Sequence, residues 1–295
     1  MNDRELFALV GLRPQPRMTV RQPVRGGKRP WVSAGILAGI VLGCLFAEVL
    51  STVDPGYMDL ENCSVKPCSR FFFGTDSLGR DIFSGIWHGG RISIAIGFLA
   101  TLISTILAMI IGTASGLAPA WLDALIMRLT DILLSIPSLL MVLFLQALFG
   151  DANVLSLAVV IGITNWTGTA RIIRTEVCRL RSSGYVVASR SMGGGFFHIM
   201  CRHLAPNFIA PVMFALVMNV RSAIVAESTL SFLGMGLPLE TVSWGSMLSL
   251  AESSLMAGSW WMVLIPGVFL VTLLMCLTNI GNYLRKSANR KDSYL

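Results

Sequence analysis

The sequence is poor in charged residues. Only 13% of its 295 residues are Asp, Glu, Lys or Arg, against roughly 25% in a typical soluble domain. This excludes an ordinary soluble globule. An apolar content of 54% excludes a disordered chain, and six cysteines are too few for a disulfide-stapled secreted module of this length. An integral membrane protein remains.

Residue patterns that carry catalysis are also lacking. The sequence has no P-loop, and its one Gly-Lys step, Gly27-Lys28, is not followed by Ser or Thr. It has no HExxH pattern and no Ser/His/Asp arrangement, and its three histidines, His88, His198 and His203, flank apolar segments. We therefore expect neither enzyme activity nor ATP binding through a P-loop in this chain.

Long runs that are poor in charge indicate six membrane-spanning helices, because a helix needs roughly 20 mostly apolar residues to cross a bilayer core. The runs are 30–53, 92–122, 132–150, 152–170, 207–232 and 253–284. Asp151 alone separates the third run from the fourth, which predicts a helical hairpin. The expected fold is an all-α polytopic membrane domain with short connections.

The basic residues predict the orientation. Seven of the 23 lie in residues 1–30, six in 171–203 and four after Leu284, whereas 151–170 and 228–284 have none. Because Lys and Arg in short loops stay in the cytoplasm, we expect both termini and the 171–203 loop on that side. Nucleic-acid binding is not expected, because these charges lack interleaved aromatic residues and flank apolar spans.

The segment 54–90 is then external. It contains Cys63 and Cys68, which either close a small disulfide or stay free thiols, and no second Cys or His pair completes a metal site. It also contains the motif FGTDSLGRDIFS, whose turn residues precede a short interfacial helix that feeds the second span. We favour a structural turn over a substrate contact. The motif residues are Gly74, Thr75, Asp76, Gly79, Arg80 and Asp81.

The loop that precedes the fifth span is too apolar to be a mere linker. Two short helical stretches flank a triple glycine at 193–195, and Pro206 falls where a first helical turn tolerates proline. The loop either contacts a partner protein or folds back on the helix ends of its own chain. The candidate contact residues are Tyr185, Ala188, Ser189, Arg190, Gly193, Gly194, Phe196, Phe197 and His203.

These motifs in this order resemble the ABC-transporter permease family of the dipeptide, oligopeptide and nickel importers. The resemblance is to the second of the two permease subunits, over about residues 71–285. It rests on FGTDSLGRDIFS, GGRIS, GTxxG, MRLTD with Ile-Pro, Ala-Arg, the 185–207 loop, and ESTLSFLGMG with Trp-Gly. The family's coupling motif, with its small pair and a Gly four residues after the second Ala, matches Val187, Ala188, Ser189 and Gly193, with Val187 where Glu is usual.

The resemblance implies a non-catalytic, multi-pass subunit of the bacterial inner membrane with the type I importer fold. Its implied partners are a sister permease, two cytoplasmic subunits that bind ATP and magnesium, and an external substrate-binding protein; the chain itself needs no cofactor. The implied cargo is peptides, nickel or metal chelates. The expected parts are a basic tail (1–31), the first span with the external segment (32–90), a five-helix core (91–284) that includes the coupling loop (182–205), and a tail (285–295).

Two charged residues within the fifth span are candidates for the translocation path, because burying a charge in a membrane is costly. Arg221 either contacts an anionic cargo group or, as we favour, pairs with a neighbouring helix. For Glu227 we favour a structural cap or an outer gate, and we expect Asp131 to pair with Arg128. The rival interpretation is a stand-alone secondary transporter or channel that uses Arg221 and Glu227, which predicts inverted repeats and broken helices.

Overall fold

The computed structural model describes residues 30–51, 53–150, 153–195, 198–238, 240–255 and 258–291. Within these ranges the regular secondary structure is helical, and an isolated bridge joins Thr75 to Asp81. The helices are α1 (Trp31–Leu45), α2 (Ala47–Leu50), η1 (Leu60–Asn62), α3 (Ile82–Leu117), α4 (Ala120–Ser135), α5 (Ser138–Phe149), α6 (Val154–Leu180), α7 (Gly184–Ser191), η2 (Ile199–Leu204), α9 (Ala205–Phe232), α10 (Trp244–Leu255) and α11 (Trp261–Lys291).

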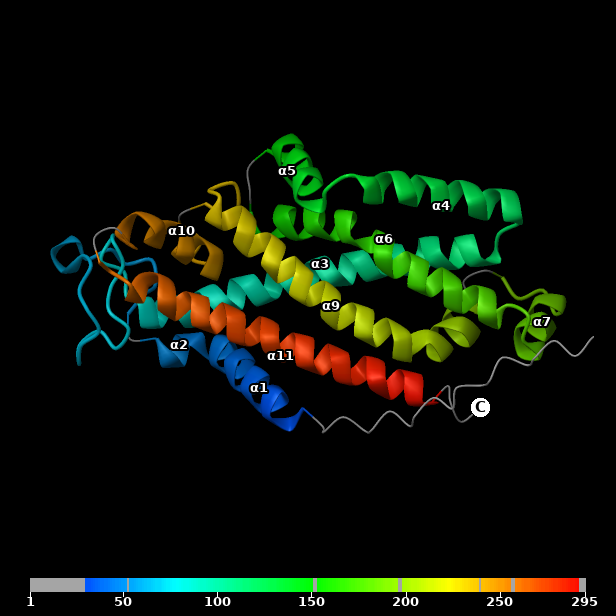
Figure 1. The fold of residues 1–295 in the computed structure, drawn as a ribbon, viewed down its shortest axis with the longest axis horizontal. Coiled ribbons are helices and arrows are strands. Elements are labelled where there is room, and N and C mark those ends of the chain that lie inside the picture. Colours follow the sequence, from blue (N-terminus) through cyan, green and yellow to red (C-terminus); the bar gives the residue numbers. More distant parts are fainter. Residues whose placement is uncertain are drawn as a thin grey trace, which may run out of the picture.

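Four long helices form the body of the molecule. Helices α3, α6, α9 and α11 run along its length, and α1 lies against α11 and α3 (Figure 1). The segment 53–81 and α10 lie at one end of this bundle, and α7 lies at the other end with the C-terminal part of α11 (Figure 1). The external segment and the coupling loop of the sequence analysis are therefore at opposite ends.

Each of the six predicted runs contains a helix, but the helices differ from the expected spans. Three have the length and composition to cross a membrane: α3, residues 212–232 of α9 and residues 261–287 of α11. The pair α4 and α5 passes the same test only jointly and is bent by 91°, and α1 is apolar but shorter. The described residues thus provide three such helices, or four if the bent pair is one span.

Three predicted boundaries are wrong. Helix α3 is continuous from Ile82, so the motif before it leads into no separate interfacial helix. The run 132–150 is broken between α4 and α5 because Pro137 lacks an N–H and drives Ile136 into an extended conformation, with ψ at 129°. The run 253–284 is divided between the end of α10 and most of α11.

Glycines allow α3 and α6 to pack backbone against backbone. A Cβ on Gly112 would lie 2.6 Å from the carbonyl oxygen of Ala170, and one on Gly116 would lie 2.6 Å from Val177. On α6, a Cβ on Gly162 would approach the carbonyl oxygen of Ala100 to 2.9 Å. Small residues of this kind let membrane helices approach closely, so the GTxxG motif is a contact between two helices.

A second packing centre joins α3 to α10. Trp244, the first residue of α10, is fully buried in a cluster that also includes residues of α1, α9 and α11. Its indole N–H donates to the carbonyl oxygen of Ile86, 2.8 Å away. A Cβ on Gly90 would lie 2.6 Å from the Trp244 ring, which shows how closely α3 passes. The large side chain therefore fixes α10 against the start of α3.

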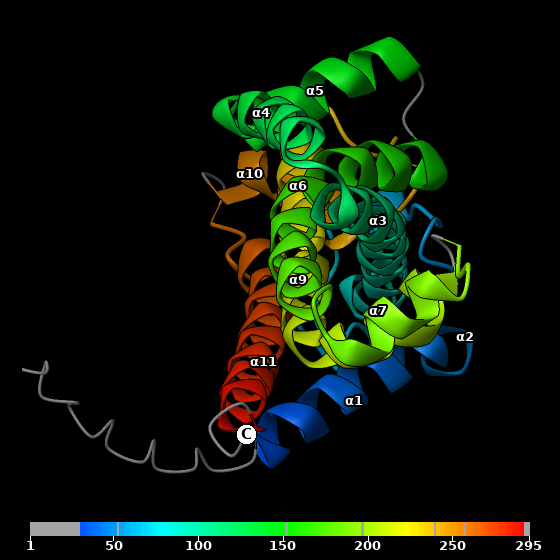
Figure 2. The same ribbon diagram turned by 90° about the vertical axis from the view of Figure 1, so that its right-hand side faces the viewer.

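Helices α4 and α5 project from the bundle (Figure 2). Helix α4 leaves the end of α3, and α5 turns back toward the start of α6. Large apolar side chains are exposed along both helices. They include Trp121, Leu125, Leu129, Ile132, Leu140, Phe144 and Leu148. We call α4 and α5 together the apolar arm.

Candidate translocation and coupling sites

The motif FGTDSLGRDIFS forms a tight turn that is fixed by hydrogen bonds. The Asp76 carboxylate accepts from the backbone N–H groups of Leu78 and Arg80, both at 2.8 Å. Gly74 and Gly79 have φ of 77° and 76°, which glycine adopts without strain. Burial raises the pKa of Asp76, and the two backbone hydrogen bonds oppose that effect. The turn thus presents its polar groups mainly to its own backbone.

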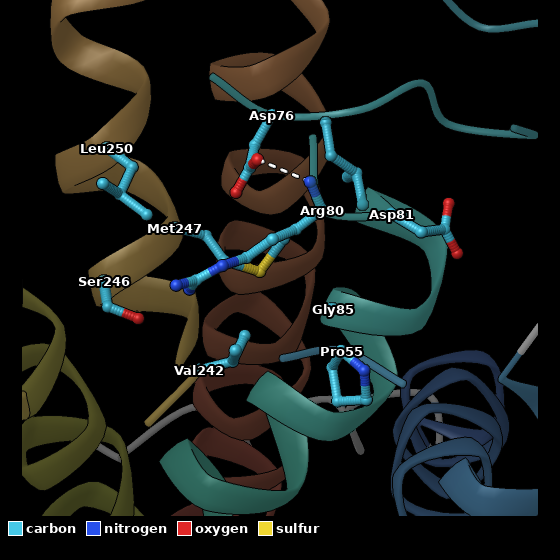
Figure 3. Close-up of a pocket in the computed structure, with 10 residues that line it drawn as sticks. Pro55, Asp76, Arg80, Asp81, Gly85, Val242, Ser246, Met247 and Leu250 are labelled. Atoms are coloured by element: carbon cyan, nitrogen blue, oxygen red, sulfur yellow. Dashed lines mark hydrogen bonds between the residues drawn. The ribbon is translucent and has the colours of Figure 1, made fainter. Parts of the chain in front are cut away.

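The same motif holds α3 and α10 in place. The Asp81 carboxylate caps α3 by accepting from the backbone N–H of Ser84 at 3.0 Å. The Arg80 side chain is 6% exposed and extends toward Ser246 of α10, whereas Asp81 points the opposite way (Figure 3). A small cavity between the motif and α10 is lined by these groups and by Met247. The motif therefore contacts the start of α3 and one face of α10.

Glu227 is enclosed by serine hydroxyl groups. Its carboxylate is fully buried and accepts from Ser93 of α3 at 2.9 Å, and from Ser228 and Ser231 of α9 at 3.2 and 3.1 Å. Ser93 Oγ also accepts a hydrogen bond from the backbone N–H of Trp244, at 3.4 Å. We call this group the serine cage. It links α3, α9 and the start of α10 through one acidic side chain.

Asn219 joins three helices and was missed by the sequence reasoning. Its amide donates to Thr169 Oγ1 of α6 at 2.9 Å and to Ser104 Oγ of α3 at 3.3 Å. Side chains such as Asn hydrogen-bond across membrane helices, so an Asn within an apolar run was the available signal. The charged Arg221, two residues further on, was singled out from the sequence, and Asn219 was not.

Arg221, for which we favoured a pairing with a neighbouring helix, makes no ion pair among the described residues. In the described parts of the chain no carboxylate lies within ion-pair distance of it. Its side chain is half-buried, and its Nε is enclosed without a hydrogen-bond partner. Six residues away on the same helix, Glu227 is fully buried. The two charges therefore do not form one site in this structure.

Two ion pairs connect the apolar arm to α6. Asp123 receives a two-pronged contact from Arg174, with Nε at 2.6 Å and Nη2 at 2.5 Å. Asp131 pairs with Arg171 of α6. The predicted local pair of Asp131 with Arg128 is therefore wrong, because α6 runs beside α4 and offers a guanidinium across the gap.

The coupling loop contains the two helical stretches that were predicted, α7 and η2, with a break between them. Gly193 has φ of +81°, a conformation that favours glycine, and η2 continues directly into α9. Pro206 is the second residue of α9, within its first turn. The loop is therefore joined to α9 without an intervening turn.

The loop has a buried face and an exposed face. Val186 and Ile199 pack into a cluster with residues of α3 and α6, so part of the loop folds back on its own chain. Ser189 is buried, whereas Val187 is 50% exposed, Met192 is 81% exposed, and Ala188 is exposed.

Several residues of the predicted contact set cannot be placed. Phe196 and Phe197 lie outside the described residues. The backbones of Tyr185, Arg190 and His203 are described but their side chains are not. A Cβ on Gly194 would lie 2.7 Å from Ser189 Oγ, so the backbone at Gly194 packs directly against Ser189 within the loop.

The two cysteines of the 54–90 segment are free thiols. Cys63 and Cys68 are both exposed, and no bond joins them. Cys63 Sγ contacts the carbonyl oxygen of Leu60 at 3.3 Å, and Cys68 Sγ accepts from the backbone N–H of Phe71 at 3.4 Å. Of the two alternatives that the sequence left open, the structure has the free thiols. Among the described residues, no group of His, Cys, Asp and Glu is arranged to hold a metal ion.

A bundle whose long helices are apolar enough to cross a bilayer defines an all-α integral membrane protein. More particularly, the chain belongs to the family of binding-protein-dependent transport system inner membrane components, whose model matches residues 108–290. It is thus a permease subunit of an ATP-driven importer, as the motifs predicted.

Curated relatives match nearly the whole chain. The oligopeptide transport system permease protein OppC of Bacillus subtilis is 34% identical over 269 residues, which cover 90% of this chain and 87% of the relative. The dipeptide permease DppC of the same organism is 32% identical over 86% and 81% of the two chains. The di/tripeptide permease DppC of Pseudomonas aeruginosa is 33% identical over 85% and 84%.

A solved structure has a similar fold. The inward-facing methionine ABC transporter MetNI contains a chain that aligns with a TM-score of 0.54 at 16% identity. The alignment covers 69% of this chain and 96% of that one. At this identity the likeness supports the fold alone, and it agrees with the expected ABC importer permease fold.

Proposed function

We propose that this chain forms, together with a sister permease, the membrane path of an importer for di- or oligopeptides. The peptide cargo is supported by one observation: relatives with peptide permease names align over more than four fifths of their length. Nickel and metal chelates remain the second cargo class, because the motifs resemble importers of both kinds. Selectivity belongs largely to the external binding protein in this proposal.

The proposed role of the coupling loop is to receive force from cytoplasmic ATPase subunits. Its exposed face, with Val187, Ala188 and Met192, offers apolar and small side chains to a partner surface. ATP and magnesium are bound by those partners, and this chain contributes no catalytic residue. The loop is the contact through which rigid-body closure of the ATPases reaches the membrane helices.

Helix α9 is the proposed transmission element. It begins where η2 ends and carries Asn219, Arg221 and Glu227. At 1.5 Å per residue, Glu227 lies about 33 Å along the axis from Ala205. A shift at the loop would therefore act on the Asn219 contacts with α3 and α6 and then on the serine cage. We propose that the serine cage holds the outer side closed and that Arg221 faces the path.

The apolar arm is the proposed contact with the sister permease. It projects from the bundle, and two ion pairs to α6 hold its α4 portion in that position (Figure 2). Membrane interfaces form through close packing rather than through burial from water. An arm that packs little on its own chain therefore has surface available for a second subunit.

Uptake of a labelled dipeptide by cells that lack this chain tests the proposed function. Uptake should fall to background, return with the wild-type chain, and depend on ATP. Uptake of peptide that is unchanged by the deletion, in cells with no other peptide importer, would refute the peptide assignment. Nickel uptake measured in the same cells separates the two cargo classes.

Cysteine labelling tests the proposed orientation separately, with both termini in the cytoplasm. An impermeant thiol reagent added to intact cells should modify Cys63 or Cys68, which are exposed. Cys178, in the 171–203 segment, should react only after the cells are opened. Modification of Cys178 in intact cells would reverse the topology.

A further inference from the structure

A cavity of about 410 Å³ lies where the coupling loop meets the ends of α3 and α4. The end of α3 contributes Ala114, Leu117 and Ala118, α4 contributes Leu122, and the loop contributes Val186 and Ile199. The mechanism above assigns no role to this cavity. Its volume falls within the range of about 300–1,000 Å³ that is usual for small-molecule sites.

The lining determines what kind of group can enter. The described lining residues carry only aliphatic side chains or none, so they offer no side-chain hydrogen bond to a polar ligand. An apolar cavity of this kind stays dry or binds hydrocarbon. The cavity also lies at the helix ends, where α3 stops at Leu117 and α4 begins at Ala120. A hydrocarbon chain from the surrounding bilayer fits both the lining and the place.

A positive charge lies beside the cavity. The Arg181 guanidinium donates to the carbonyl oxygen of Gly116, 3.2 Å away, one residue from the lining residue Leu117. The nearby Asp123 is already paired with Arg174. Within the described ranges Arg181 forms no ion pair, and it is exposed. Its charge is therefore available to an anionic group at this end of the bundle.

We propose that the cavity binds one acyl chain of an anionic phospholipid whose phosphate contacts Arg181. The proposal rests on the proposed function in one respect, because it places this end of the bundle at the cytoplasmic leaflet, where anionic lipids give a negative surface. The bound chain lies between α3, α4 and the coupling loop. The lipid thus packs against one face of the coupling loop, and the opposite face of the loop contacts the ATPases.

Native mass spectrometry of the purified, delipidated complex tests this proposal. Phosphatidylglycerol is titrated back, with phosphatidylcholine of the same acyl chains as the comparison. Ala118→Phe fills the cavity, and Ala38→Phe, at an exposed position of α1 away from the cavity and from the apolar arm, is its matched control. We expect the wild type and Ala38→Phe to retain one more tightly bound phosphatidylglycerol than Ala118→Phe.

The head-group contact is tested with variants that neutralise a charge at an exposed position. Arg181→Gln should weaken phosphatidylglycerol binding at least tenfold and remove the preference over phosphatidylcholine. Arg179→Gln neutralises another exposed arginine at the same helix end. It should change neither the phosphatidylglycerol binding nor the preference over phosphatidylcholine. These variants also serve if Ala118→Phe fails to assemble.

Two results would overturn the proposal. One is an equal lipid count in Ala118→Phe and the wild type, and the other is equal binding of the two lipids by the wild type. If Ala118→Phe keeps its lipid count and also loses the ATPase subunits, the cavity is assigned to a protein side chain. Loss of peptide uptake plays no part in the measurement, so failure of the proposed function is distinguishable from failure of this one.

Discussion

Glu227 shows how a single buried acid organises its surroundings. A carboxyl group inside a membrane protein is costly unless its oxygens are hydrogen-bonded, and here serine hydroxyls from two helices supply those bonds. The sequence revealed Glu227 in an apolar run and favoured a structural role or an outer gate. It could not reveal Ser93, which is 134 residues away and becomes a neighbour only because α3 and α9 pack together.

Replacing Glu227 tests the serine cage. Glu227→Leu should lower the melting temperature of the solubilised complex, because each buried hydroxyl left without its acceptor costs about 1–3 kcal/mol. Glu227→Gln keeps the shape and one acceptor oxygen, so it should retain most of the stability. Thermal unfolding followed by tryptophan fluorescence measures both variants. A Glu227→Leu complex as stable as the wild type would show that the cage contributes nothing.

Gly193 carries a backbone requirement that its neighbour Gly195 lacks. A Cβ at either position would meet no atom within 4 Å, but only Gly193 has a positive φ. Gly193→Ala should therefore cost about 1–2 kcal/mol of local strain, and Gly193→Val should cost more because of its β-branch. Gly195→Val is the control.

Co-purification of the ATPase subunits measures the consequence. We expect Gly193→Val to retain less ATPase than Gly195→Val, with uptake reduced in proportion. Equal retention by the two variants would mean that the shape of the break does not matter for the contact.

At the scale of elements, the sequence predicted where apolar helices occur better than where they end. Runs that are poor in charge place a helix in each of the six regions, because hydrophobic length is encoded locally. The Ile-Pro step signalled a break at Pro137. The sequence nevertheless predicted one continuous span, because the run is apolar on both sides of the proline. The continuity of α3 from Ile82 into the span was missed for the opposite reason, because His88 and Arg91 interrupt the apolar run but are tolerated within the helix.

The packing of α3 on α6 provides a test at this scale. Gly112→Val should prevent the helices from closing, because its Cβ would lie 2.6 Å from a backbone oxygen of α6. Gly168→Val on α6 introduces the same residue where a Cβ meets no atom within 4 Å, and it has the same helix-propensity cost.

Size-exclusion chromatography of the solubilised complex distinguishes the two variants. Gly112→Val should give little assembled complex, and Gly168→Val should give an amount near the wild type. Similar yields from both would contradict close backbone packing at Gly112.

For the whole molecule, the sequence supplied the family and the general architecture, because its motifs are ordered along most of the chain. The sequence did not predict the orientation of the apolar arm. It also did not predict the ion pairs of Asp123 and Asp131, because they depend on how α4 lies beside α6. The bent arm is a broken helix, the feature that the rival secondary-transporter interpretation predicted. Family membership favours the importer, in which an exposed loop joined to α9 has a purpose.

Ala188→Glu tests the central claim most directly, because Ala188 lies on the exposed face of α7 and the change adds charge without disturbing the buried face. Ser182→Glu, at an exposed position of the same loop but outside α7, is the control. Dipeptide uptake and ATPase co-purification are measured on the same membranes. The account predicts that Ala188→Glu is inserted normally yet loses ATPase attachment or separates ATP hydrolysis from uptake, while Ser182→Glu stays near the wild type. Normal uptake with Ala188→Glu would contradict it.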